Sequence, residues 1–184
     1  MGPGVVDAST IYVAVGGYTA VLRSLSIDVG TSVGWAAEPG RYGSADLSPR
    51  PGEADEMRFV RLRGLLKSLL LGMGGVADLV LAEGSAGFIR GQNAVRLAHE
   101  YRGVIRLFCG ERGIPYFEVA PSSLKRFATG HGAVPKELKG KVTSKQMMVE
   151  AARTRLGYKG RSDDEADALI AAQTLAAKYA ESKP

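Results

Sequence analysis

The first third of the chain has the hydrophobic pattern of short strands joined by tight turns. Val21–Asp28, Ser32–Ala37 and Arg41–Leu47 each combine apolar and β-branched residues over a length typical of a strand. The Glu38-Pro39-Gly40 tripeptide between the second and third segments is a turn signal. The pattern therefore predicts a meander of three strands.

The rest of the chain alternates between helical periodicity and short apolar runs. Apolar residues recur at threes and fours over 54–71, which predicts a helix. Leu79–Ala82 is a continuous apolar run, typical of a strand buried on both faces. The next predicted elements are a helix at 93–111, a strand at 116–119, a short helix from Pro121 and a loop at 129–141. Two helices follow, which begin with the capping boxes Thr143–Gln146 and Ser162–Glu165, and the second of them is predicted to end near Lys178. This order predicts a mixed α/β layer fold.

The N-terminal segment, Met1–Ala20, leaves two interpretations open. Ile11–Val15 has the composition of a strand, but the whole segment could equally be a leader added ahead of the native start. It has neither the basic start nor the long apolar stretch of a signal peptide. We therefore predict an N-terminal extension at 1–20, ordered or disordered, followed by one domain at 21–180.

Composition and charge narrow the functional classes. The apolar content of 45% is ordinary for a globular protein, and no run of about 18 apolar residues predicts a membrane span. The single Cys109 excludes an internal disulfide framework and suits a reducing cytoplasm. The net charge is +5, whereas residues 121–161 alone contain ten Lys/Arg and two acids, a net charge of +8. This stretch is either a solvated surface or a phosphate-binding face.

Four carboxylates occupy positions from which they can converge. Asp28 closes the first strand, Glu83 closes the buried strand, and Asp164 and Asp167 are three apart on the last helix. Asp163 and Asp167, four apart, also share a face, so the choice of Asp163 or Asp164 stays open. Converging carboxylates are hard oxygen ligands for a pair of divalent cations, which would assist attack on an anionic phosphodiester. The pattern predicts Mg²⁺, with Mn²⁺ able to substitute.

Four segments in order resemble the RuvC-type Holliday-junction resolvases of the RNase H-like superfamily. They are Leu25–Ala36, Leu79–Glu83 with the glycine-rich loop up to Asn93-Ala94, Gly113–Lys125 and Asp164–Leu169. The resemblance implies an RNase H-like fold, with a mixed five-stranded sheet of antiparallel meander plus parallel strands and helices on both faces. It implies a homodimer that cuts four-way DNA junctions, and it is compatible with a member of the phage-borne branch.

The same resemblance assigns roles to single residues. Asp28, Glu83, Asp164 and Asp167 would be the metal-binding catalytic residues. Lys125 and Lys145 would lie near the scissile phosphate, with Lys145 counted among the catalytic residues. The chain departs from the bacterial pattern by a longer loop after Glu83 and by its N-terminal extension.

Contacts to branched DNA are predicted on the glycine-rich loop and on the basic stretch. Phe88 is an aromatic residue in the middle of the loop 84–91 and is followed by Arg90. It either packs beneath the loop or stacks on an unpaired base at the crossover. The predicted DNA-binding residues are Phe88, Arg90, Lys125, Arg126, Lys136, Lys139, Lys141 and Lys145. The use of a branch-migration helicase as a partner is left open.

The sequence also has features of three other classes of protein. The segment Asp28–Ser32 resembles the first phosphate loop of sugar kinases and actin-like ATPases, but these proteins need about twice this length. A nuclease of the same fold could act on other branched DNA or on RNA. A nucleic-acid-binding module without catalysis could retain the fold, although all four carboxylates are present here.

Overall fold

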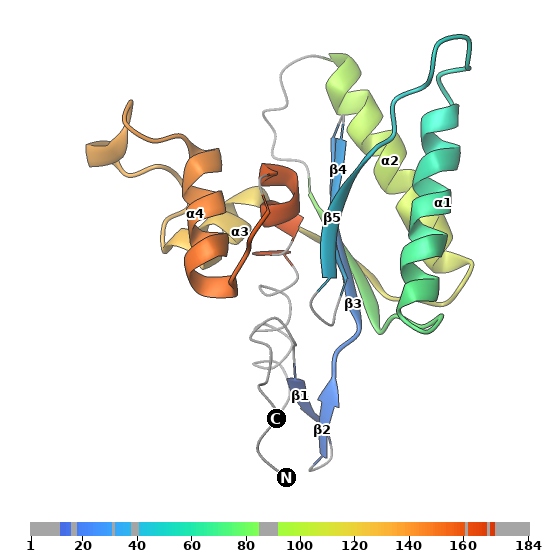
Figure 1. Cartoon of the computed structure of the whole chain (residues 1–184), viewed down its shortest axis with the longest axis horizontal. Coiled ribbons are helices and arrows are strands. Elements are labelled where there is room, and N and C mark those ends of the chain that lie inside the picture. The colour runs from blue at the N-terminus through green and yellow to red at the C-terminus, as the bar shows by residue number, and fades with distance from the viewer. Residues whose placement is uncertain are drawn as a thin grey trace.

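The computed structural model describes residues 12–15, 18–30, 32–37, 41–84, 92–160, 162–168 and 170–171. Its centre is a five-stranded mixed sheet in the order β5-β4-β3-β6-β7. The strands are β3 Ser24–Val29, β4 Ser32–Ala37, β5 Arg41–Asp46, β6 Leu79–Glu83 and β7 Tyr116–Val119. β3, β4 and β5 form the predicted antiparallel meander, while β6 pairs in parallel with both β3 and β7 (Figure 1).

Helices cover both faces of this sheet, as the resemblance implied (Figure 1). On one face lie α1 (Met57–Gly72) and α2 (Gln92–Gly110). The other face carries α3 (Pro121–Thr129), α4 (Ser144–Leu156) and a last helix, which comprises the helical residues 163–168 and 170–171. In the part of the chain that is described, no helix combines the length and the apolar character needed to cross a membrane.

The pleat of β3 separates two hydrophobic cores. Leu25 and Ile27 are buried in a first core with residues of α1 and α2, among them the buried thiol Cys109. Ser24 and Ser26 are also buried but point the other way, because side chains alternate along a strand. The opposite face of the sheet contributes Ala36 and Leu81 to the second core, with residues of α3, α4 and the last helix. Asp28, two residues beyond Ser26, therefore faces this second layer.

Three parts of the chain depart from the predicted elements: the N-terminal segment, the start of α1 and the loop at 129–141. The N-terminal segment contains a hairpin of β1 (Tyr12–Val15) and β2 (Tyr18–Val21), so the first strand of the main sheet begins at Ser24 and not at Val21. Residues 50–57 form turns in which the Arg50 N–H donates to the Glu53 carboxylate, and α1 consequently starts three residues late. The predicted loop at 129–141 contains one short 3₁₀ helix, η1 (Lys136–Leu138).

The two predicted capping boxes have different outcomes. At α4 the box is complete, because Thr143 and Gln146 each bond the other's backbone N–H. At the last helix the Glu165 N–H approaches the Ser162 hydroxyl at 3.4 Å, but the Glu165 carboxylate accepts hydrogen bonds from Ser44 and Tyr158 instead. The spacing correctly located the start of the helix, whereas the second half of the box is replaced by tertiary contacts.

Candidate metal centre

Asp28 and Glu83 lie next to each other at the ends of two paired strands. β3 and β6 are parallel, with Ser26 opposite Leu81 and Ile27 opposite Ala82. The next pair in this register is Asp28 and Glu83. Since Leu81 belongs to the second core and side chains alternate, both carboxylates point toward α3, α4 and the last helix.

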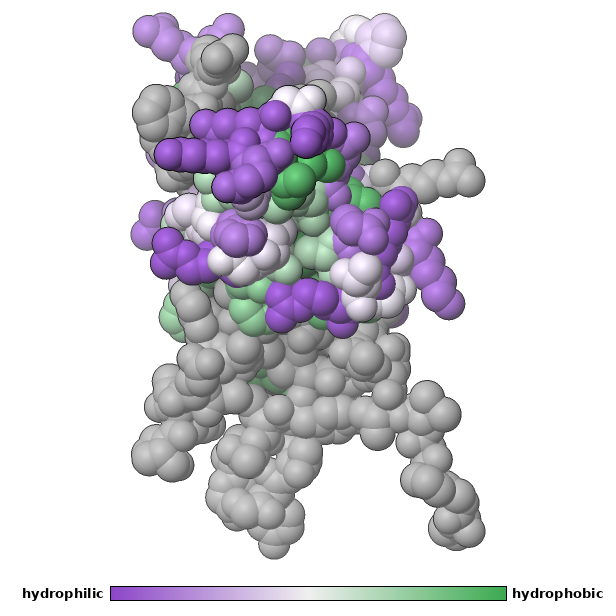
Figure 2. Space-filling model, turned by 90° about the vertical axis from the view of Figure 1, so that its left-hand side faces the viewer, coloured by the Kyte–Doolittle hydropathy of each residue, from purple (hydrophilic) through white to green (hydrophobic). Residues whose placement is uncertain are grey.

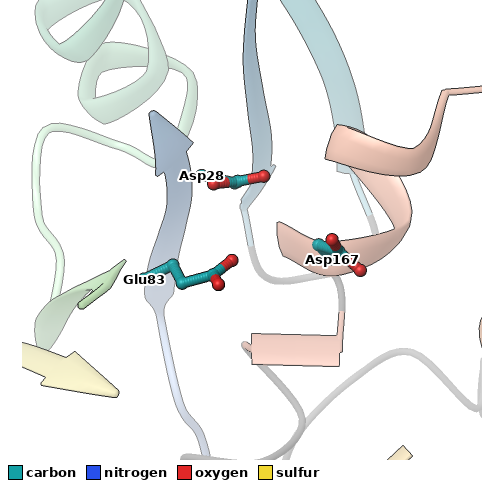
Figure 3. Close-up of side chains that lie close together, drawn as sticks. All are labelled: Asp28, Glu83 and Asp167. Carbon is teal, nitrogen blue, oxygen red and sulfur yellow. The ribbon is translucent and has the colours of Figure 1, made fainter. Parts of the chain in front are cut away.

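Asp167 completes the cluster from the last helix. One carboxylate oxygen from each of Asp28, Glu83 and Asp167 can be chosen so that all three lie within 4.8 Å of one another. Figure 3 shows the three side chains close together, two from neighbouring strands and one from the helix that faces them. Three of the four carboxylates singled out in the sequence therefore converge.

Gly34 allows the last helix to lie close enough to the sheet for this convergence. It stands opposite Asp28 in the β3–β4 register. A Cβ at Gly34 would lie 2.1 Å from the backbone oxygen of Asp164 and 2.2 Å from its carbonyl carbon, which is far inside van der Waals contact. No residue with a side chain fits here without displacing the first turn of the helix. The sequence contained Gly34 within its first motif, but nothing in the pattern revealed this contact.

Two further residues hold the same helix in place. The Ser32 hydroxyl, at the start of β4, donates to the Asp164 carboxylate. Glu165 accepts from the Ser44 hydroxyl at 2.9 Å and from the Tyr158 hydroxyl at 2.8 Å, which ties the helix to β5 and to the segment that precedes it. Reasoning from the sequence missed all of these contacts. Those of Ser32 and Ser44 join positions more than 100 residues apart, and the local contact of Tyr158 with Glu165 leaves no mark in the hydrophobic pattern.

The adjacent acids Asp163 and Asp164 have different partners. Asp163 forms an ion pair with Lys145, and this hydrogen bond holds the pKa of Asp163 below its usual range. Asp164 accepts from Ser32, and its charge contributes to the raised pKa of Asp28, after the larger effect of burial. Asp164 therefore borders the three-carboxylate cluster without belonging to it. Its role as a fourth ligand stays a prediction.

Without a cation, burial and mutual repulsion disfavour negative charge on the three clustered carboxylates. Burial, followed by the charges of Glu83 and Asp167, raises the pKa of Asp28 well above its usual value. Burial also raises the pKa of Glu83, and burial together with the Glu83 charge raises the pKa of Asp167 to about 7. Carboxylates in such surroundings resist ionisation unless a positive charge is supplied.

The donor set fits a hard divalent cation. All three side chains offer carboxylate oxygens, which Mg²⁺ and Mn²⁺ prefer over nitrogen or sulfur ligands. Among the described residues, the Oδ1 atom of Asp167 is buried and has no hydrogen-bond partner. Buried polar atoms are nearly always satisfied, so an oxygen of this kind beside two other carboxylates is suited to a cation.

Two lysines flank the carboxylates. The charge of Lys145 partly offsets the upward pKa shift that burial and its neighbours impose on Asp28. Lys125, on α3, does the same for the burial-driven shifts of Glu83 and Asp167. Lys145 lies in the first turn of α4, as predicted, and its side chain is 72% exposed. Both ammonium groups therefore act electrostatically on the cluster.

The remaining predicted DNA contacts lie in three places. Arg126 is exposed on α3. Lys136, Lys139 and Lys141 are exposed on and after η1, which projects beyond α4 away from the sheet (Figure 1). Phe88 and Arg90 lie outside the described residues.

The fold and the carboxylate cluster together define the class of structure, an RNase H-like fold with acidic residues at the ends of its central strands. No protein-family model matches the sequence. The structure is similar to Thermus thermophilus RuvC in complex with a Holliday-junction substrate, with a TM-score of 0.67, 22% sequence identity, and coverage of 87% of this chain and 96% of RuvC. A second Thermus thermophilus RuvC structure gives a TM-score of 0.66 with the same identity and coverage.

A eukaryotic resolvase also shares the fold. The yeast mitochondrial Holliday-junction resolvase Ydc2 gives a TM-score of 0.52 and 15% identity, over 87% of this chain and 82% of Ydc2. The chain thus has the fold of the RuvC-type resolvases, and the resemblance predicted from its four sequence segments is confirmed at the level of the fold.

Proposed function

We propose that this protein is an endonuclease that resolves four-way DNA junctions by paired, symmetric phosphodiester cleavage with divalent metal ions. The observation that carries the proposal is the convergence of Asp28, Glu83 and Asp167 from three separate segments, flanked by Lys125 and Lys145. The same fold in RuvC is known in complex with a Holliday-junction substrate. Such a reaction needs access to DNA, and we place it in the cytoplasm of a bacterial or phage-infected cell.

The carboxylates and the lysines of the site would have different roles in the reaction. Asp28, Glu83 and Asp167 would hold Mg²⁺, and Mn²⁺ accepts the same oxygen ligands. When bound there, such ions would supply activation of water at neutral pH and charge stabilisation of the leaving oxygen. Lys125 and Lys145 attract the phosphate, offset its charge and orient it against the carboxylates. Asp164, held by Ser32, would serve as a fourth ligand.

A homodimer fits the symmetry of the substrate. A four-way junction carries two equivalent strands to be cut, so two copies of one site related by a twofold axis can nick it symmetrically. Each protomer would contribute one carboxylate cluster and one basic face. The lysines on and after η1 are exposed and would extend that face along the DNA arms.

Cleavage assays on matched substrates test the proposal. A synthetic four-way junction, a linear duplex of the same sequence and an RNA duplex are incubated with the protein in Mg²⁺, in Mn²⁺ and in EDTA. We expect symmetric nicks in the junction with either metal and none in EDTA. Asp28→Asn and Glu83→Gln should abolish cleavage yet still bind the junction, because binding depends on the basic face. Cleavage by Asp28→Asn at the wild-type rate would refute the site assignment.

The alternative functions correspond to other outcomes of the same assays. Preferential cleavage of RNA, or equal cleavage of the linear duplex and the junction, would assign a different substrate to the same centre. Junction binding without cleavage in any metal would identify a binding module that retains the fold.

A further inference from the structure

A groove runs along α4 directly beside the carboxylate cluster. It has a volume of about 450 Å³ and is lined by Val142, Lys145, Gln146, Val149, Glu150, Arg153 and Asp163. Six of these residues lie on or just before α4 at alternating intervals of three and one, and together they form one side of the helix. Lys145 and Asp163 line the groove, and their charges also act on Asp28 and Asp167 respectively, so the groove begins at the border of the candidate metal centre.

The lining combines an apolar floor with a charged rim. Val142 and Val149 are partly buried, and Val149 packs against the second core. Around them Lys145 and Arg153 supply positive charge, while Gln146 and Glu150 offer a neutral amide and a carboxylate. Figure 2 shows this side of the molecule, where hydrophobic residues are visible between hydrophilic ones.

We propose that this groove binds one nucleobase of the DNA strand that is cleaved, next to the scissile phosphate. The inference rests on the proposed nuclease function. A base is joined to its phosphate through a single sugar, so a phosphate held by Lys145 brings its base to a groove that begins at the same lysine. The flat faces of a base pack on aliphatic side chains, and its edge presents donors and acceptors that Glu150, Gln146 and Arg153 can meet.

The nature of the substrate favours this occupant. A base must leave its stack to enter the groove, and this costs least where pairing is already disturbed, as at the centre of a junction. A groove that holds one base also gives the enzyme a means to prefer certain sequences at the cleavage point. A second groove, between α1 and α2, is lined by Val60, Arg63, Gly64, Lys67, Phe108 and Arg112, but it shares no residue with the carboxylate site.

Methyl NMR on the full-length protein tests occupancy directly. In EDTA, where no cleavage occurs, the valine methyl signals are followed during titration with oligo(dT) and with an all-abasic oligomer of the same length. We expect the methyls of Val142 and Val149 to shift through the ring current of a base with oligo(dT) only. Val60, which is 59% exposed on α1, is the control and should not move. Equal shifts with both oligomers, or none at saturation, would overturn the proposal.

A cleavage assay with single abasic sites gives the second readout. Junctions carry one abasic site at each position around the cut in turn, and we expect one position at which the wild-type rate falls about tenfold. Val149→Asn should cleave the intact and abasic junctions at similar rates, whereas Val60→Asn should keep the wild-type preference. Equal rates on every abasic junction would overturn the base site while leaving the nuclease function intact. A complete absence of metal-dependent cleavage, with the methyl shifts still present, would instead reject the nuclease function alone.

Discussion

Replacing Gly34 with alanine should disable the metal centre without removing any of its ligands. The added Cβ would lie 2.1 Å from the Asp164 oxygen and 2.8 Å from the Asp164 Cβ. Because Cβ atoms do not approach closer than about 3 Å, the first turn of the last helix must retreat by about 1 Å. Asp167 is less than one turn further along the same helix and would move with it, away from Asp28 and Glu83.

The expected magnitude follows from that displacement. A misplacement of about 1 Å in a catalytic arrangement can cost about 100-fold in rate, and overpacking costs about 1–3 kcal/mol of stability. We therefore expect Gly34→Ala to lose about 100-fold in kcat/KM on a four-way junction and to bind Mn²⁺ more weakly by calorimetry. Junction affinity in EDTA should be close to that of the wild type, because the basic residues do not move.

Gly43→Ala is the matched control. Gly43 lies opposite Trp35 in the β4–β5 register, and a Cβ there would come within 2.7 Å of the Trp35 ring. Trp35 packs against the first core, on the other face of the sheet from the carboxylates. This variant should lose a similar amount of stability yet retain cleavage and metal affinity. Wild-type cleavage by Gly34→Ala, or equal losses in the two variants, would show that the contact with the helix does not position the site.

Three further predictions concern the charges of the site. In EDTA the melting temperature should fall as the pH rises from 4 to 8. The reason is that a carboxyl whose folded pKa is raised, such as Asp167 at about 7, favours the folded state only while it is protonated. Mg²⁺ should reverse the loss at pH 8, and a pH-independent difference in melting temperature between EDTA and Mg²⁺ would contradict this prediction. Asp163→Asn should cleave at close to the wild-type rate, whereas Lys145→Ala should lose about 100-fold in single-turnover cleavage. Loss of cleavage by Asp163→Asn would instead identify Asp163 as a metal ligand. Lys125→Ala should reduce the slope of log K against log salt for junction binding by about 0.9, and an unchanged slope would remove it from the phosphate contacts.

The sequence was sufficient to predict how the strands contribute to the site. The meander, the apolar run at Leu79–Ala82 and the acids that end two of the strands were all visible as local patterns. Once β3 and β6 are paired in parallel, strand periodicity alone brings Asp28 and Glu83 to one face. Local pattern and tertiary structure agree here because a buried strand has only two faces.

The contribution of the last helix could be predicted only in part. Spacing placed Asp163, Asp164 and Asp167 near one another, but helical geometry gives two equally good pairs among them. The choice depends on how the helix is rotated against the sheet, which is set by Gly34, Ser32 and the contacts of Glu165. The contacts that Gly34, Ser32 and Ser44 make with the helix join segments more than 100 residues apart. Glu165 itself carried a local signal for a different role, as the second half of a capping box.

The composition of the two cores explains why the site forms on one particular face of the sheet. Among the described residues, the first core is built mainly from large side chains and has three alanines in seventeen residues, whereas the second has seven in thirteen. Small side chains let helices approach a sheet closely, and an aspartate reaches only a short distance from its backbone. A last helix held off by leucines would leave Asp167 too far from Asp28 and Glu83 to share a cation. The alanine-rich layer and Gly34 therefore have the same effect, since both bring the helix backbone near enough for three short carboxylates to meet.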